Sequence, residues 1–343
     1  MKRDDNANGI LFVTEEEIEF IKHFNENWAK FSDDIRISQS QINWGNRLRP
    51  RLVYWSFIIE NENLSEDQYK AVASLAACME LIHKSTILLD DWIDQDNARH
   101  GQPSFHIQYG AELTVMYALN ILSKSLTELN NIFFDFSNET VYHACMKNIS
   151  ETMRQMTLGE IQELTLTSDE LFDVAKIRHI IKLETAELLT NSMLMGYYGN
   201  GGNNSELIAQ LKNIGYDCGY IFQCLNDLEP FCEKNINKQH KGYYNLDYDR
   251  NRKNIGIALL YEVSNKADRA ILKQKPSYEE LIRLFNKYGI IEFFLKDLKD
   301  LNLKIILRIN SLKGLGVRET WCENFNKFIK NVIDVCLSRL GYK

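Results

Sequence analysis

Apolar residues recur every three or four positions along most of this chain, and that spacing constrains its fold more than any other feature. One such stripe, within residues 66–95, consists of Ala71, Leu75, Cys78, Ile82, Thr86 and Leu89. An α-helix turns once every 3.6 residues, so these positions share one face. Similar stripes recur around residues 111–129, 141–166, 176–198, 205–231, 253–265, 278–301 and 320–340. Alternation typical of strands is weak, and we therefore expect an all-α fold, a single large helical bundle.

Few residues interrupt this pattern. The sequence contains only 4 prolines, which leaves long segments free to stay helical. No linker rich in glycine, serine or proline divides the chain, and no abrupt change of charge does so either. We therefore expect residues 1–343 to form one domain.

Composition excludes some functions and favours one compartment. The net charge of −7 argues against a nucleic-acid partner, which normally selects a basic surface. The 7 cysteines are scattered without metal-site spacing, as expected for reduced thiols. Neither a signal-peptide pattern nor a run of membrane-spanning length is present, so we expect a cytoplasmic protein without a transmembrane segment.

The chemistry is concentrated where the stripe of residues 66–95 ends, in Asp90-Asp91-Trp92-Ile93-Asp94. Asp90 and Asp94 are one helical turn apart, so their carboxylates leave the same face. Adjacent carboxylates repel one another unless a cation or water compensates them. Mg²⁺ suits such a site because it accepts a few carboxylates and fills its other positions with water or phosphate oxygens. A solvated acidic helix end is the alternative interpretation.

The segment after this motif resembles the trans-polyprenyl diphosphate synthase family, whose first motif runs DDxxDxxxxRRGxPxxH. Here Asp94 leads into QDNARHGQPSFH, and other family motifs stand in the family's order over about residues 40–260. The matching segments are Gly45–Pro50 (GKRLRP in the family), Gly159–Leu164 (GQxxDL), Glu184–Leu188 (KTAxL), Phe222–Asp227 (FQxxDD) and Asp247–Asn254 (DLxxGKxT).

The resemblance implies a helical fold of the class I terpenoid synthase type around a central apolar cavity, and commonly a homodimer. It implies an allylic isoprenoid diphosphate as donor and about three Mg²⁺ ions. The implied metal ligands are Asp90, Asp91, Asp94, Asn226 and Asp227. The implied catalytic residues are Asp90, Asp94 and Arg99, and the implied diphosphate-binding residues are Arg47, Arg49, His83, Arg99, Lys182 and Gln223. Ser85 and Thr86 stand where a bulky ring limits chain length in the family; both are small, which predicts a chain of about C15 to C20.

Several family positions are altered. Asn46 replaces a lysine and His100 an arginine of the patch that binds isopentenyl diphosphate. An amide cannot replace an ammonium opposite a diphosphate, and a histidine does so only when protonated. Glu184 replaces the lysine of KTAxL, with Lys182 two residues earlier as a candidate to compensate. Asn226 replaces the first aspartate of the second metal motif.

Three interpretations are therefore open. The chain is a prenyltransferase that elongates with isopentenyl diphosphate or passes its prenyl group to another acceptor, such as the tryptophan of a peptide. In this it is similar to the isoprenyltransferases that modify pheromone peptides. Alternatively, it is a class I terpene cyclase that acts on a single prenyl diphosphate. The third interpretation is a non-catalytic partner subunit of a prenyl diphosphate synthase.

Overall fold

The computed structural model describes residues 14–34, 45, 47–61, 63–99, 101–135, 139–232 and 250–339. The helices of its first half are α1 (Ile18–Asp34), α3 (Leu48–Phe57), α4 (Glu66–Ile93), α5 (Phe105–Tyr109), α6 (Ala111–Asp135) and α7 (Glu139–Leu164). Those of its second half are α8 (Val174–Ile181), α9 (Glu187–Gly199), α10 (Ser205–Leu228), α11 (Ile255–Val263), α12 (Lys266–Lys273), α13 (Tyr278–Tyr288), α14 (Ile290–Ser311) and α15 (Glu319–Arg339). Within these ranges the strands are β1 (Ala98–Arg99) and β2 (Gln102–Pro103), which pair antiparallel. The all-α prediction is confirmed.

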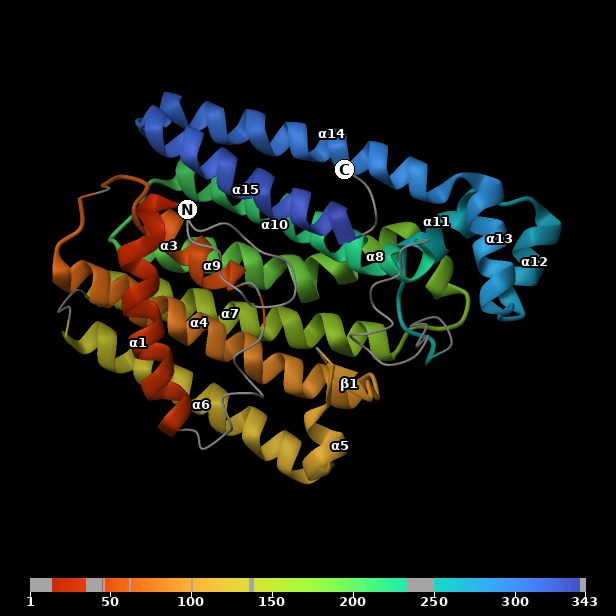
Figure 1. Ribbon diagram of the computed structural model, residues 1–343, viewed down its shortest axis with the longest axis horizontal. Coiled ribbons are helices and arrows are strands. Elements are labelled where there is room, and N and C mark those ends of the chain that lie inside the picture. Colours follow the sequence, from red (N-terminus) through yellow and green to blue (C-terminus); the bar gives the residue numbers. More distant parts are fainter. Residues whose placement is uncertain are drawn as a thin grey trace.

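The long helices are stacked side by side (Figure 1). Helix α6 runs along one long side of the molecule, and α14 with α15 runs along the opposite side. Helices α4, α7, α9 and α10 lie between these sides, while α1 crosses them near one end. Helix α4 packs on α6, α1, α3 and α9, and α10 packs on α9 and α14. The first acidic motif therefore ends a helix that lies in the middle of the bundle.

Helix α4 has clear boundaries at both ends. It begins after Ser65, which forms a reciprocal capping box with Gln68. It ends at Ile93 with Asp94 as its C-cap, and the next residue, Gln95, takes a left-handed conformation with φ of 55°. A left-handed residue just beyond a helix is a common way to stop it. The sequence from Asp94 onward thus leaves the helix and forms the β1–β2 hairpin.

Two of the predicted stripes are not single helices. Residues 278–301 are divided at Gly289, whose φ of 60° ends α13 and starts α14. Glycine adopts this conformation without the steric cost that a Cβ imposes. Residues 176–198 contain a π-helical turn, η3 (Lys182–Ala186), between α8 and α9. One extra residue in this turn shifts the register of the stripe, and such turns often mark functional sites.

The last helix, α15, packs against α3 in one core. The stripe predicted in the last helix is confirmed, because Trp321, Phe325 and Phe328 are buried against Trp55 of α3. The indole of Trp321 donates to the Trp55 carbonyl at 2.8 Å.

Close approach of α3 and α9 needs Gly196, where a Cβ would stand 2.0 Å from a backbone oxygen of α3.

In the described part of the chain, one helix is long and apolar enough to span a membrane, and that helix is α4. However, 78% of its most apolar 18-residue stretch is buried inside the fold. A helix in the core of a protein can have the same length and hydropathy, so this feature does not place α4 in a membrane.

Candidate active site

The three aspartates at the end of α4 point in different directions. The side chain of Asp90 is 47% exposed, whereas that of Asp91 is only 4% exposed. Asp91 turns inward and accepts a hydrogen bond from Arg99 Nε at 2.6 Å. Burial raises the pKa of Asp91 to about 6, although Arg99 opposes this shift. Asp91 is therefore engaged by an arginine inside the fold, whereas Asp90 keeps a half-exposed carboxylate that a metal ion could reach.

Arg99, on β1, is surrounded by carboxylates. Besides Asp91, its guanidinium lies 3.6 Å from Asp90 and 3.8 Å from Asp96. Burial alone would lower the pKa of Arg99, but these three acids raise it. Arg99 is thus a fully charged fork of donors at the acidic end of α4, where a diphosphate would compete with aspartates for its N–H groups.

The segment before α11 joins the first acidic motif to α7. Arg252 Nε lies 2.7 Å from Asp94, and Arg252 Nη2 donates to Glu160 at 2.9 Å. Arg252 also lies 3.3 Å from Glu163, and these acids raise its pKa despite burial. Arg252 stands where the family has the lysine of GKxT, so the structure brings this cation to the first motif.

The reversed charge at Glu184 is balanced from this same segment. Glu184 lies in the π-helical turn η3, and its carboxylate pairs with Lys253, which also pairs with Glu163. Lys182, the expected compensating residue, is instead exposed, with its ammonium 4.5 Å from the centre of the Tyr216 ring. The ammonium beside residue 184 is therefore supplied by Lys253.

Glu163 and Glu184 share this lysine unequally. Burial acts against ionisation of Glu163, but Lys253 and Arg252 hold its pKa below the usual range. Burial raises the pKa of Glu184 well above its usual range, because Lys253 is outweighed once Glu163 adds its repulsion. The ligand atoms of Glu160, Glu163 and Glu184 lie within 4.8 Å of one another. Two cations from residues 252 and 253 stabilise this carboxylate cluster.

The second acidic motif ends α10. Asn226 is exposed, but Asp227 is buried and fully engaged. One Asp227 oxygen accepts from Gln223 at 2.7 Å, and the other accepts from the Ile255 backbone N–H at 2.8 Å. Gln223 in turn accepts from Thr185 of η3 at 2.7 Å. Asp227 thus holds the start of α11 against α10, which leaves Asn226 as the residue of this motif that a metal ion would reach.

A basic patch lies between α3 and the middle of α4. Arg49 donates to His83 Nε2 at 2.8 Å, and Arg47 donates to Glu80 at 2.8 Å. Burial and the charge of Arg49 hold the pKa of His83 well below its usual range, so the ring is neutral and accepts this bond. The structure therefore brings together Arg47, Arg49 and His83, while Asn46 and His100 lie outside the described residues.

Lys84 is a member of this patch that the sequence motifs do not include. It is buried, with its ammonium 3.2 Å from Glu80. A Cβ on Gly45 would stand 3.5 Å from this ammonium, so Lys84 lies beside the segment that precedes α3. Burial lowers its pKa to about 7 although Glu80 opposes the shift. The sequence signal that identifies Lys84 is the presence of a lysine within the apolar stretch that forms α4.

The two residues expected to set chain length remain a prediction. Ser85 is buried and donates to the Ile82 carbonyl at 2.8 Å, and Thr86 is half-buried and donates to the His83 carbonyl at 2.9 Å. Both hydroxyls are satisfied within α4. Each residue therefore presents a small surface with no unsatisfied polar group.

Comparisons with known proteins agree with this architecture. The family model for polyprenyl synthetases matches residues 36–284. The geranylgeranyl diphosphate synthase of Saccharolobus solfataricus is 29% identical over 187 residues, which are 54% of this chain and 53% of that protein. The heptaprenyl diphosphate synthase component 2 of Bacillus subtilis is 25% identical over 231 residues, 67% of this chain and 61% of that protein. The chain spans about half the length of the first curated relatives it matches.

Solved structures are similar over nearly the whole chain. Geranylgeranyl pyrophosphate synthase from Corynebacterium glutamicum, complexed with isoprenyl diphosphate and magnesium, has a TM-score of 0.73 at 16% identity and covers 92% of this chain and 98% of its own. Octaprenyl pyrophosphate synthase from Helicobacter pylori has a TM-score of 0.72 at 23% identity, with the same coverage of 92% and 98%. At such identities the likeness concerns the fold.

Proposed function

Because the chain belongs to the polyprenyl synthetase family, we propose that it is a prenyltransferase whose donor is an allylic isoprenoid diphosphate. One observation carries this proposal: a single helix, α4, presents two anion-binding regions. Its C-terminal end carries Asp90 beside Arg99 and Asp94 beside Arg252, and its middle carries His83 and Lys84 beside Arg49 of α3 and Arg47, the residue before α3. Two diphosphates, or one diphosphate and another acceptor, would fit this pairing.

The donor diphosphate is assigned to the end of α4. Asp90 and Asp94 would hold Mg²⁺, because they offer hard oxygen ligands and Asp90 is half-exposed. Mg²⁺ neutralises a diphosphate and makes it a better leaving group. Arg99 would donate to the same diphosphate, and Arg252 keeps Asp94 oriented through its 2.7 Å contact. Because Asp227 is engaged by Gln223 and α11, we assign the second motif a smaller share of the metal than the family pattern implies.

The acceptor is assigned to the basic patch. Arg47 and Arg49 are held by Glu80 and by neutral His83, which fixes their guanidinium groups in place. Lys84 would supply a further charge, because an arriving diphosphate stabilises the protonated amine of a lysine whose pKa lies near neutrality. This compensates in part for Asn46, and it favours isopentenyl diphosphate as acceptor over an uncharged peptide.

The proposed donor or product chain is about C15 to C20. Small side chains at Ser85 and Thr86 support this range, as does the name of the Saccharolobus solfataricus relative, a geranylgeranyl diphosphate synthase.

A partner subunit of a prenyl diphosphate synthase is the second candidate. The specific observation in its favour is the second acidic motif, where Asp227 has an internal role and Pro230 replaces the last aspartate. The relative from Bacillus subtilis is itself named as one component of a synthase.

We also propose a single-domain, cytoplasmic homodimer. Apolar side chains recur on the exposed surface of α5 and α6, where Ile107, Tyr109, Leu113, Met116 and Leu119 are each 46–61% exposed. Several large apolar side chains exposed on neighbouring helices commonly mark a protein interface. Sedimentation equilibrium would test the dimer, and Met116→Glu should weaken it.

Mass spectrometry of reaction products tests the function. The protein and Mg²⁺ are incubated with geranyl, farnesyl or geranylgeranyl diphosphate, each with and without isopentenyl diphosphate, and Asp90→Ala serves as the control. A longer diphosphate formed only with isopentenyl diphosphate would support the proposal. A hydrocarbon or terpenol would indicate a cyclase, and no product with any donor would favour the partner subunit.

A further inference from the structure

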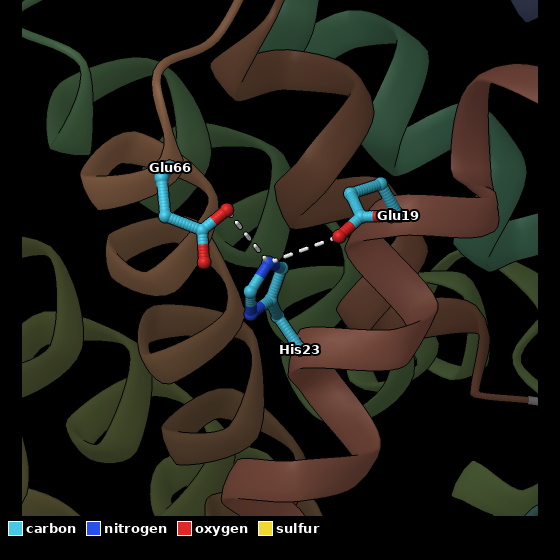
Figure 2. A group of neighbouring side chains, drawn as sticks. All are labelled: Glu19, His23 and Glu66. Atoms are coloured by element: carbon cyan, nitrogen blue, oxygen red, sulfur yellow. Dashed lines mark ion pairs between the residues drawn. The ribbon is translucent and has the colours of Figure 1, made fainter.

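A histidine and two glutamates meet where α1 crosses the start of α4, far from the candidate active site. Glu19 and His23 are one turn apart on α1, and Glu66 lies in the first turn of α4. Figure 2 shows both carboxylates directed at the imidazole from two different helices. Glu66 is roughly 36 Å from Asp90 along the axis of α4.

The histidine is buried but lacks a hydrogen-bond partner for its inner nitrogen. The His23 side chain is only 5% exposed, and in the described part of the chain its Nε2 makes no hydrogen bond. Nε2 lies 3.4 Å from a Glu19 oxygen and 3.6 Å from a Glu66 oxygen. Both distances exceed the usual 2.7–3.2 Å of a hydrogen bond of this kind. Its Nδ1 faces Glu26 at 3.7 Å.

The distances from His23 Nε2 to the two carboxylate oxygens instead match the spacing of ligand atoms around a metal ion. A tetrahedral Zn²⁺ holds nitrogen and oxygen ligands about 2.0–2.2 Å from the metal, which places neighbouring ligand atoms roughly 3.3–3.6 Å apart. The ligand atoms of Glu19, His23 and Glu66 all lie within 4.8 Å of one another. A small movement of the exposed Glu66 side chain would complete three corners of such a tetrahedron, with water at the fourth.

We propose that Glu19, His23 and Glu66 form a binding site for a divalent transition metal ion of the Zn²⁺ class. One imidazole with two carboxylates favours such an ion over Mg²⁺, which prefers oxygen ligands alone. The ion joins α1 to α4. Lys22 and Lys70, which pair with Glu19 and Glu66 at 2.8 and 3.6 Å, compete with it and limit its affinity.

The site is tested by isothermal titration of the full chain with Zn²⁺ in excess Mg²⁺, which saturates the carboxylates of α4. Glu66→Gln is the main variant, because Glu66 is exposed and the amide keeps its shape. We expect one Zn²⁺ per chain, and at least roughly tenfold weaker binding in Glu66→Gln. Glu19→Gln should weaken binding in the same way.

The chain contains a matched control in the pair His143 and Glu139 of α7. They have the same i, i+4 spacing and the same 3.4 Å separation, but both are exposed. His143→Ala should therefore leave Zn²⁺ binding unchanged. Equal Zn²⁺ affinity of the wild type and both glutamine variants would overturn the proposal, and so would loss of the bound ion in His143→Ala.

Discussion

Replacing Lys253 with methionine should destabilise the protein strongly, because this lysine neutralises two buried carboxylates. The side chains of Lys253, Glu163 and Glu184 are 10%, 2% and 13% exposed. In the variant, Glu163 keeps its contact with Arg252 at 3.3 Å. Glu184 loses Lys253, its ion-pair partner among the described residues. Methionine retains most of the volume, so the change removes mainly charge.

At a pH high enough to ionise Glu184, the expected loss follows from the cost of an unpaired buried charge, about 3–5 kcal/mol. A chain of 343 residues has an unfolding entropy of about 0.7 kcal/mol per kelvin at its midpoint. The melting temperature should therefore fall by about 4–7 °C. Chemical denaturation monitored by circular dichroism measures the free energy directly.

A second substitution separates charge from packing. Lys253→Met combined with Glu184→Gln should recover most of the lost stability, because the amide carries no charge to leave unpaired. Lys273→Met serves as the control, since its pair with Asp169 is exposed and its loss should leave the melting temperature unchanged. A loss below about 1 kcal/mol in Lys253→Met, or a double variant no more stable than the single one, would refute the reasoning.

The loss should also depend on pH in a defined direction. Burial raises the pKa of Glu184 above its ordinary value of 4.5, so between these two values the folded state binds more protons than the unfolded state. Stability contributed by this group therefore falls as pH rises through that window. Lys253 holds this pKa down, so in Lys253→Met the pKa rises further and the variant loses more stability than the wild type as pH increases. The deficit of Lys253→Met should therefore be smaller near pH 5 than near pH 8.

Four further predictions concern the site. Asp90→Ala should lower kcat by orders of magnitude at saturating Mg²⁺ without changing the melting temperature. Normal turnover by this variant would show that the acidic motif is only a solvated helix end. Asp227→Ala should cost about 1–3 kcal/mol in denaturation experiments, because it frees the first N–H of α11; an unchanged midpoint would contradict its anchoring role. Ser85→Phe should shorten the products seen by mass spectrometry, and unchanged lengths would show that this position does not line the chain pocket. Asn46→Lys with His100→Arg should tighten isopentenyl diphosphate binding in calorimetry, and unchanged affinity would show that the two missing charges do not limit binding.

The parts of the structure formed by residues close together in the sequence were predicted best. The end of α4, the turn at its aspartates and the cation on the adjoining hairpin are all local features, set by helical period and capping. The C-terminal aromatic stripe was equally accessible, because Trp321, Phe325 and Phe328 are spaced to share one helix face. Such patterns depend on geometry that a sequence carries directly.

Contacts between distant residues could not be predicted in the same way. The pairing of Glu184 with Lys253 joins a π-helical turn to the start of α11, and no periodicity relates the two positions. The sequence offered Lys182 as the nearer candidate, but its helix face directs it to Tyr216. Likewise, an aspartate in a metal-motif position does not reveal that both oxygens of Asp227 are used within the protein.

Backbone conformation locates the site independently of its side chains. Among the described non-glycine residues, Arg47, Gln95, Asn251 and Lys275 have positive φ. Such conformations persist where the surrounding structure determines them, because each costs of order 1–3 kcal/mol. Three of the four flank the candidate active site: Arg47 starts α3 and faces Glu80, Gln95 follows Asp94, and Asn251 precedes Arg252. The chain thus keeps left-handed backbone in the turn before α3, after the end of α4 and before α11, the three segments that carry the charged groups of the candidate site.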